Sequence, residues 1–300
     1  MNEIDLTLLE PVLQTYGPQG RTALLPALHA AQDLYGYLPE PVAAAVARAL
    51  HVPLADVHGV IEFYAMFYPQ KVAQTVLHVC NDPACGMAGA DALFKNLTSR
   101  VELNLDTQSV TVERAPCLGL CEHAPALLVQ GAQVAQADQR SWEDLVRGRL
   151  PRHRSLVGGD VSILTANCGK NSPTTLEEYT QSGGYAGLRR ALQSSPAEVI
   201  AEVKASGLVG RGGAAFPTGL KWEGAANASG DAKYVVCNAD EAEPGTFKDR
   251  VLMENDPHRI LEGLLICAYA VGASYGYWYI RGEYTAQMEI VAHAVEEARQ

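Results

Sequence analysis

The chain has 300 residues, enough for about two domains of ordinary size. Hydrophobic residues make up 48% and charged residues 19% of the sequence, which excludes a collagen-like, coiled-coil or disordered protein. The formal net charge of −11 comes with no basic stripe, so we expect no nucleic-acid partner. The acidic N-terminus lacks the regions of a secretory signal, and glycines break the uncharged stretch 263–280. We therefore expect a cytoplasmic protein without a transmembrane segment.

Residues 1–72 are predicted to form a helical bundle. Leucines recur at helical spacing from Leu24, and Gly36 supplies a stop. Pro41 and Pro53 each open a further helix. The aromatic run that follows, residues 63–68, is expected to pack in a core rather than to bind a cofactor.

The hydrophobic pattern changes period in residues 73–148. Strands are predicted at 74–79 and 109–113, helices at 91–97 and 142–146, and a hairpin around Gln130 and Gly131. This order predicts a small thioredoxin-like sheet.

A linker is predicted at residues 149–185, with turn chemistry and one short strand at 161–164. Residues 186–300 then alternate helices and strands, which predicts a parallel α/β domain. Ser195 and Glu198 form a capping box that opens a helix reaching Ser206. A short buried strand at 234–237, a helix at 257–271, a strand at 276–280 and a helix at 285–299 follow.

Four of the seven cysteines form two pairs, each directly after a predicted strand. Cys80 and Cys85 have the spacing C-x4-C, and Cys117 and Cys121 have C-x3-C. Zinc favours the tighter C-x2-C knuckle, whereas wider loops leave room for a [2Fe–2S] cluster held by four thiolates. Zinc and four inert buried cysteines are the alternatives.

The residues around these cysteines resemble a known family. The segments 80–86 and 115–126 are similar to the 24-kDa-type subunit of NADH dehydrogenases over residues 5–148. The resemblance implies a thioredoxin-like [2Fe–2S] ferredoxin domain in which all four cysteines are metal ligands. His123 would pack near the cluster.

Residues 210–215 formally match the nucleotide-binding pattern G-x-G-x-x-A. The expected preceding element is a helix, which argues against a Rossmann turn, and no G-K-[ST] of a P-loop is present. The glycines and the cations Arg211 and Lys221 suit close approach to a phosphate or a flat ring. A tight surface turn is the alternative.

Four carboxylates follow the predicted strand 234–237 within a dozen residues: Asp240, Glu241, Glu243 and Asp249. The carboxyl end of a strand is where α/β proteins place ligand chemistry. Carboxylates suit hydroxyl-rich ligands such as a ribityl chain or a ribose. A metal site is the competing interpretation.

Together, residues 210–222 and 238–250 resemble the 51-kDa-type flavoprotein subunit of NADH dehydrogenases, a module also found in NAD-reducing hydrogenases and formate dehydrogenases. The resemblance covers about residues 174–300 and implies the start of an FMN/NADH-binding α/β domain. It implies these cofactor-binding residues: Gly210, Arg211, Gly212, Gly213, Phe216, Lys221, Asn238, Asp240, Glu241 and Glu243. Ala215 and Ala242 stand where glycine is typical, and FMN rather than a side chain would carry the hydride chemistry.

Both modules on one chain are most similar in layout to the β subunit of soluble NAD-dependent formate dehydrogenase. We therefore predict a diaphorase-type subunit that passes electrons between NAD(H), FMN and iron–sulfur clusters, with a molybdenum, hydrogenase or complex I subunit as partner. The alternatives are an NADH-quinone oxidoreductase or NAD-reducing hydrogenase flavoprotein subunit, and a non-catalytic [2Fe–2S] relay or docking module.

Two further expectations follow. The flavoprotein family continues with a C-G-E-E-like stretch, a ubiquitin-like domain and a [4Fe–4S] site, so we expect this chain to lack the C-terminal half. A redox sensor is a third interpretation, with Cys168 in a predicted turn as its candidate residue, whereas Cys237 and Cys267 are expected in the core.

Overall fold

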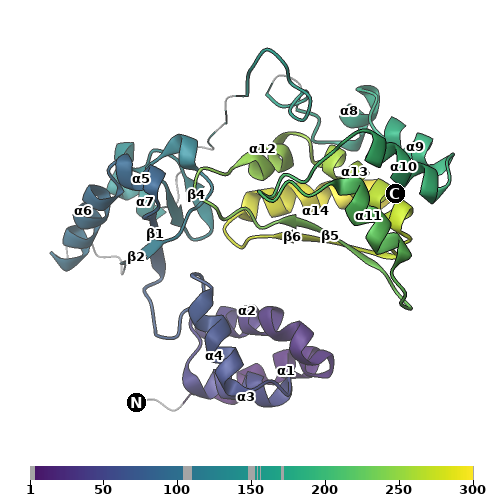
Figure 1. Ribbon diagram of the computed structural model, residues 1–300. Coiled ribbons are helices and arrows are strands. Elements are labelled where there is room, and N and C mark those ends of the chain that lie inside the picture. Colours follow the sequence, from purple (N-terminus) through teal and green to yellow (C-terminus); the bar gives the residue numbers. More distant parts are fainter. Residues whose placement is uncertain are drawn as a thin grey trace. The chain divides into compact units, whose positions relative to one another are not determined.

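The computed structural model describes residues 4–103, 110–147, 153, 155, 157–169 and 172–299. The chain divides into two compact units, and Figure 1 labels their helices and strands. The first consists of Met1–Leu118, Ala124–Gln130 and Val134–Leu150. The second consists of Gly119–His123, Gly131–Gln133 and Pro151–Gln300.

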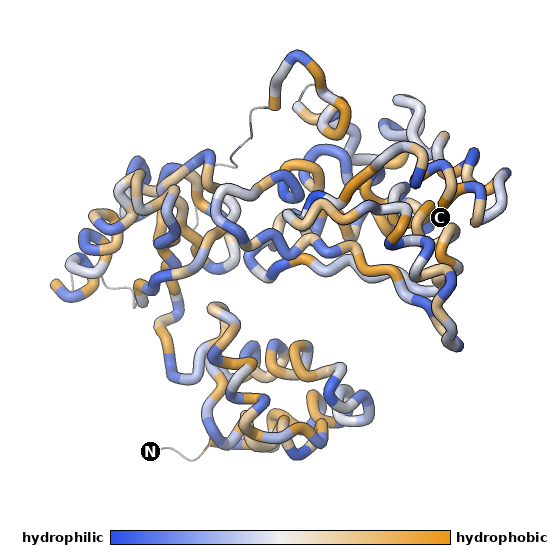
Figure 2. The backbone as a smooth tube through the Cα atoms, in the orientation of Figure 1, coloured by the Kyte–Doolittle hydropathy of each residue, from blue (hydrophilic) through white to orange (hydrophobic). Residues whose placement is uncertain are grey.

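The first unit begins with the expected helical bundle. Its helices are η1 (Leu6–Leu9), α1 (Glu10–Tyr16), η2 (Gly17–Ala23), α2 (Leu24–Tyr35), α3 (Glu40–Ala49) and α4 (Leu54–Phe63). Figure 2 shows hydrophobic segments alternating with hydrophilic ones along these helices, whose apolar faces form one core around Leu28, Val46 and Val57. Gly36 ends α2 in the left-handed conformation, with φ of 75°, as the sequence predicts. Of the aromatic run, Phe67 is buried, but Phe63 is 80% exposed and does not join the core.

A four-stranded sheet follows, and all of it except Ala132 and Gln133 lies in the same unit. Its strands are β1 (Thr75–Cys80), β2 (Val110–Ala115), β3 (Leu127–Val129) and β4 (Ala132–Val134), in the order β2-β1-β3-β4. β1 pairs parallel with β2 and antiparallel with β3, so it has a neighbour on both sides, and all six of its residues are buried. The predicted hairpin is confirmed, since Gln130 and Gly131 both have positive φ, as a two-residue turn requires.

Short helices complete this part of the chain. They are α5 (Pro83–Met87), α6 (Ala90–Glu102), η3 (Cys121–His123), η4 (Ala137–Gln139) and α7 (Trp142–Arg147). α6 packs against β1 and β2. The predicted helix–strand order is confirmed, with α6 longer than expected at both ends.

The second unit is built around one long helix. Its elements are α8 (Leu176–Gln181), α9 (Ala186–Leu192), α10 (Pro196–Ala205), α11 (Thr218–Asn227), β5 (Tyr234–Ala239), α12 (Lys248–Asn255), α13 (Pro257–Val271), β6 (Tyr275–Ile280) and α14 (Thr285–Arg299). α13 packs against α9, α10, α11, α12 and α14, and also against β5 and β6. The capping box at Ser195 and Glu198 opens α10 as predicted. β5 and β6 pair in parallel, which confirms the α/β prediction.

Two strand predictions in this unit are wrong. Residues 161–164 form an irregular segment that bends into a turn rather than a strand, and Val161 and Ile163 are 79% and 78% exposed. β5 is not a buried strand, because its residues alternate in exposure, with Tyr234 and Val236 at 56% and 57%. The tyrosines of β6 lie on the same exposed face, and the Tyr234 and Tyr275 rings stack 5.4 Å apart. In the described part of the chain, none of the helices combines the length and apolar character needed to cross a membrane.

Candidate functional site

Three of the predicted cluster ligands lie together in the first unit. Cys80 ends β1, Cys85 lies in α5, and Cys117 comes two residues after β2. Backbone hydrogen bonds fix the strand ends, from Cys80 N to Ala126 O (3.1 Å) and from Asn81 N to Ala115 O (3.0 Å). The exposed fractions of the three cysteines are 1%, 2% and 0%. The thiol of Cys80 makes hydrogen bonds with those of Cys85 and Cys117.

The surroundings of these sulfurs suit thiolate ligands. The hydrogen bond with Cys117 lowers the pKa of the Cys80 thiol, whereas the hydrogen bond with Cys85 and burial raise it, and the result is a pKa of about 11. Backbone N–H groups point at the sulfurs: that of Asp82 at Cys80, and that of Ala126 at Cys85 over 3.4 Å. An N–H donor stabilises a thiolate. These buried thiols therefore fit an iron–sulfur cluster, whose iron would bind them as thiolates.

Cys121 belongs to the second unit, at the start of η3. Its sulfur accepts a hydrogen bond from the backbone N–H of Gly245 over 3.1 Å. Among the described residues, no set of three or more histidine, cysteine and carboxylate side chains surrounds a position for a single ion. A [2Fe–2S] cluster is compatible with this, because its four thiolates are shared between two irons. That all four cysteines hold one cluster stays a prediction.

The other three cysteines do not form reactive thiolates. Cys168 is 9% exposed rather than lying open in a turn, and burial raises its pKa to about 11. Burial likewise raises the pKa of Cys237 and of Cys267 to about 11. A thiol with a raised pKa is a poor nucleophile at neutral pH, which argues against a redox-sensor interpretation.

The glycine-rich loop lies between α10 and α11 in the second unit. Residues 210–216 are closed at their base by hydrogen bonds from Gly210 N to Phe216 O and from Thr218 N to Leu208 O, both 2.9 Å. The element before the loop is helix α10, which confirms that it is not a Rossmann turn. All of residues 210–217 are exposed.

The backbone of this loop is open to a ligand. A Cβ placed at Gly212 or Gly213 would meet no atom within 4 Å, so a flat ring or a phosphate has room to approach the N–H groups. Arg211 and Lys221 are exposed beside it, and Phe216 is 56% exposed. Ala215 has a φ of 50°, the left-handed region that favours glycine. This position is one of the two where the sequence departs from the family pattern.

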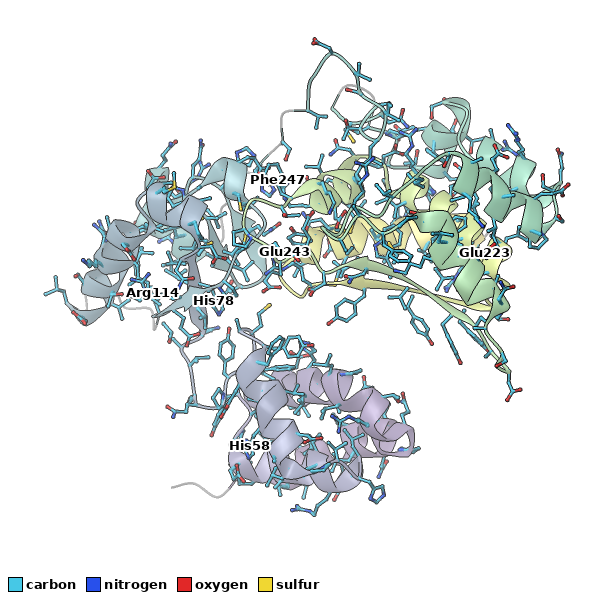
Figure 3. All side chains as sticks on the ribbon, in the orientation of Figure 1. His58, His78, Arg114, Glu223, Glu243 and Phe247 are labelled. Atoms are coloured by element: carbon cyan, nitrogen blue, oxygen red, sulfur yellow. The ribbon has the colours of Figure 1, made fainter. Side chains whose placement is uncertain are left out.

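The acidic loop connects β5 to α12. The side chain of Asn238 accepts a hydrogen bond from Asp240 N at 3.0 Å, which turns the chain at the end of β5. Asp240 and Glu243 are exposed, and Figure 3 shows Glu243 on this loop together with Phe247. These carboxylates are placed to accept hydrogen bonds from the hydroxyls of a ligand.

Glu241 has a different environment from its neighbours. It is 2% exposed, and its oxygens accept the backbone N–H groups of Asp249 (2.8 Å) and Arg250 (3.0 Å) at the start of α12. The hydroxyl of Tyr284 donates to the same carboxylate at 3.2 Å, and Lys248 Nζ lies 3.4 Å away. Glu241 therefore organises the N-terminus of α12, and its predicted contact with flavin stays a prediction.

Sequence reasoning missed the buried charges near this loop. Arg250 is fully buried, and Arg281 is 6% exposed and donates to Glu241 O at 2.8 Å. Burial and the nearby Glu241 raise the pKa of Asp249, against the effect of Lys248. The signal was present in the run Lys248-Asp249-Arg250, since three adjacent charges directly before the apolar residues Val251, Leu252 and Met253 need partners where the chain is buried.

Comparison with known proteins assigns the two regions. Residues 9–149 match the family "Thioredoxin-like [2Fe-2S] ferredoxin", and residues 203–300 match the "Nuo51 FMN-binding domain". The F 2 subunit of NADH-quinone oxidoreductase of Rhizobium meliloti (strain 1021) is 52% identical over 139 residues, which cover 46% of this chain and 33% of that protein. NAD-reducing hydrogenase HoxS subunit alpha of Cupriavidus necator is 30% identical over 296 residues, covering 93% of this chain and 49% of that protein.

A solved structure has a similar fold. The crystal structure of an NAD+-reducing [NiFe]-hydrogenase in the air-oxidized state aligns with a TM-score of 0.68 and 26% identity, covering 92% of this chain and 48% of that one. The chain thus spans half or less of the length of the proteins it matches. The chain therefore carries a thioredoxin-like [2Fe-2S] ferredoxin domain at residues 9–149, followed by a region at residues 203–300 that matches the Nuo51 FMN-binding domain.

Proposed function

We propose that this chain is the NAD(H)-linked electron-transfer part of a larger redox enzyme. The observation that carries the proposal is the 296-residue similarity to the HoxS alpha subunit, because it spans both modules in the same order. FMN would supply the conversion between a two-electron hydride and single electrons, and the [2Fe–2S] cluster would hold one electron at a time.

The residues of the second unit have distinct parts in this function. The exposed backbone of residues 210–213 would lie against the flavin, with Arg211 and Lys221 near its phosphate. Asp240 and Glu243 would accept hydrogen bonds from ribityl and ribose hydroxyls. Phe216, half exposed at the base of the loop, would stack on the nicotinamide.

The residues of the cluster site would exclude water from the cluster and keep its cysteine ligands in the thiolate form. Cys80, Cys85 and Cys117 are buried, and their backbone donors stabilise thiolates. We propose Cys121, with its donor Gly245, as the fourth ligand.

The partner is proposed to be another redox subunit, since the relatives named above are subunits of larger enzymes. The HoxS subunit shares the fused layout and supports a hydrogenase-type partner. Formate as the distal substrate rests on the fused layout alone, and quinone is supported by the similarity of part of this chain to the NADH-quinone oxidoreductase protein. The cytoplasmic location expected from the sequence stays a prediction.

Reconstitution with iron, sulfide and FMN tests the proposal. We expect bound flavin, iron in a [2Fe–2S] absorption spectrum, and reduction of ferricyanide by NADH. Cys80→Ser should abolish the cluster spectrum, whereas Cys267→Ser should keep it. Glu243→Gln should raise the Kd for NADH more than that for FMN, whereas Glu289→Gln, an exposed carboxylate on α14, should change neither.

The alternative functions give different results. A relay or docking module would bind the cluster but show no flavin binding and no NADH–ferricyanide activity. Absence of iron after reconstitution would contradict the cluster itself.

A further inference from the structure

Arg250 is a buried cation that holds a distant segment of the chain. It is 0% exposed, and it lies in α12 of the second unit. Its Nε donates to the backbone carbonyl of Gly119 at 2.8 Å, and its NH2 group pairs with the carboxylate of Glu122. The segment Gly119–His123, which carries Cys121, is thus fixed by one guanidinium at both of these residues.

The remaining donors of Arg250 are also engaged. NH1 contacts both oxygens of Glu254 at 3.2 Å and Nε2 of His153 at 3.1 Å, and NH2 donates to Ser155 Oγ at 3.1 Å. Ser155 Oγ in turn donates to Glu122 at 2.8 Å. A fork of five N–H donors matches this set of acceptors, whereas a single ammonium cannot reach all of them.

Gly119 fits a second buried group. Its φ is +69°, and a Cβ on this residue would come within 2.0 Å of the hydroxyl of Tyr284. Tyr284 is 0% exposed and its hydroxyl donates to Glu241, so the ring has no room to move aside. The loop between Cys117 and Cys121 can therefore pack this closely against Tyr284 only because its central residue, 119, is glycine.

Fixing this segment places the sulfur of Cys121 against the acidic loop. The backbone N–H of Gly245 donates to Cys121 Sγ at 3.1 Å. Gly245 lies in a turn closed by the hydrogen bond from Thr246 N to Glu243 O at 3.0 Å, on the loop that bears Glu243 and Phe247 (Figure 3). Glu241 ties the other end of this loop to the first backbone N–H groups of α12.

We propose that Arg250 and Tyr284 are positioning residues that hold Cys121 so that Gly245 donates a hydrogen bond to its sulfur. The inference rests on the proposed function, in which Cys121 is a cluster ligand. Hydrogen bonds to ligand sulfurs are one of the means by which proteins set the potential of an iron–sulfur cluster. Such a bond stabilises the reduced, more negative cluster. The hydrogen bond from Gly245 would therefore raise the reduction potential of a cluster that has Cys121 as a ligand.

The test compares charge-conserving and neutral variants of the reconstituted chain. Arg250→Lys keeps the charge but loses the fork, and Arg259→Lys on α13 is the matched control without a contact to Gly119–His123 among the described residues. Gly119→Ala introduces the clash with Tyr284. Gly89→Ala is its control, since Gly89 also has a positive φ (+93°) but open space around its Cβ position.

The readouts are iron content, the EPR g values of the reduced cluster, and its midpoint potential in a dye-mediated titration. We expect Arg250→Lys and Gly119→Ala to shift the potential to more negative values and to change the g values, while both controls match the parent chain. Loss of iron in Gly119→Ala but not in Gly89→Ala, with an unchanged circular dichroism spectrum, would also support the proposal.

Parent-like g values and potential in Gly119→Ala would overturn the proposal, and this variant decides the question if Arg250→Lys does not fold. Failure of the proposed function gives a separate result, since the parent chain would then show no [2Fe–2S] signal.

Discussion

The two units bury different kinds of side chain. In the described part of the first unit, the interior is apolar, and its buried polar residues are Thr75 and His78. The second unit buries a larger set of polar and charged residues: Glu241, Arg250, Asp256, His258, Glu262, Arg281 and Gln287. The first unit therefore gains stability mainly from the hydrophobic effect, whereas the second depends on paired polar groups, whose removal leaves partners unsatisfied.

The same contrast holds for the two sheets. β1 has a neighbour on each side, and all its side chains are buried. β5 has β6 as its partner, and one face of this pair exposes Tyr234, Val236, Tyr275 and Tyr277. A two-stranded sheet with an exposed apolar face gains less stability from burial than a sheet with a buried central strand. The free energy of unfolding of the second unit should therefore depend more on pH than that of the first.

The largest expected effect tests the apolar core of the first unit. Leu28→Ala removes a fully buried side chain from α2 and should lower the free energy of unfolding by about 3 to 5 kcal/mol. The loss should be the same at pH 5 and pH 8, because no charge is involved. Leu8→Ala, at a side chain that is 54% exposed, is the control. Urea denaturation measures both, and a loss for Leu28→Ala that varies with pH would break the comparison.

The corresponding change in the second unit removes a buried carboxylate. Glu262 accepts hydrogen bonds from Tyr179 OH (2.5 Å), Tyr185 N (3.0 Å) and Leu188 N (2.9 Å). Glu262→Ala leaves these donors unsatisfied and should lower the free energy of unfolding by roughly 3 kcal/mol. Glu202→Ala removes an exposed carboxylate and should cost far less. Equal losses in the two variants would show that the buried network contributes little.

A third change should stabilise the second unit. Ala215 has a φ of 50°, a backbone conformation that is strained for alanine but not for glycine. Ala215→Gly should therefore raise the free energy of unfolding by about 1 kcal/mol. Ala214→Gly is the matched control and should give no gain, because φ of Ala214 is not positive. Thermal unfolding of both variants measures the difference. A gain in Ala214→Gly as large as that in Ala215→Gly would contradict the assignment of strain to residue 215.

The smallest effect concerns the pH dependence of the second unit. Burial raises the pKa of Asp256 above its ordinary value of 3.8, although the hydrogen bond from Asn167 opposes this. A carboxyl with a raised folded-state pKa stabilises the fold at low pH, and this contribution is lost as the pH rises through that value.

The stability of the parent relative to Asp256→Asn should therefore fall as the pH rises above about 4, near the ordinary pKa of 3.8. Asp33→Asn, at an exposed carboxyl of α2, serves as the control. Urea denaturation at several pH values measures the trend. A parent that gains stability relative to Asp256→Asn over this range would contradict the sign.

Local signals in the sequence predicted much of the fold. The capping box at Ser195 and Glu198 starts α10, and the turn at Gln130 and Gly131 forms the hairpin, because neighbouring residues determine both features. The strand expected at 161–164 fails because strand formation also needs a partner, and these apolar residues have none in the described structure. The hydrophobic pattern of a segment does not indicate whether a partner strand exists.

The candidate site was also predictable only where neighbouring residues determine it. Spacing identified the cysteine pairs and the two loops of the second unit, and the structure places Arg211, Asp240 and Glu243 on exposed positions of those loops. The burial of Glu241 was not visible in the sequence, since its donors include Tyr284, which is 43 residues away. The contact of Arg250 with Gly119 spans 131 residues and was likewise hidden.

Anaerobic addition of NADH to the reconstituted chain tests the central claim most directly. The proposed function predicts that NADH bleaches the flavin absorption and produces the EPR signal of a reduced [2Fe–2S] cluster in the same sample. A chain in which dithionite reduces the cluster but NADH leaves both flavin and cluster oxidised would contradict electron transfer from NAD(H) through these two modules.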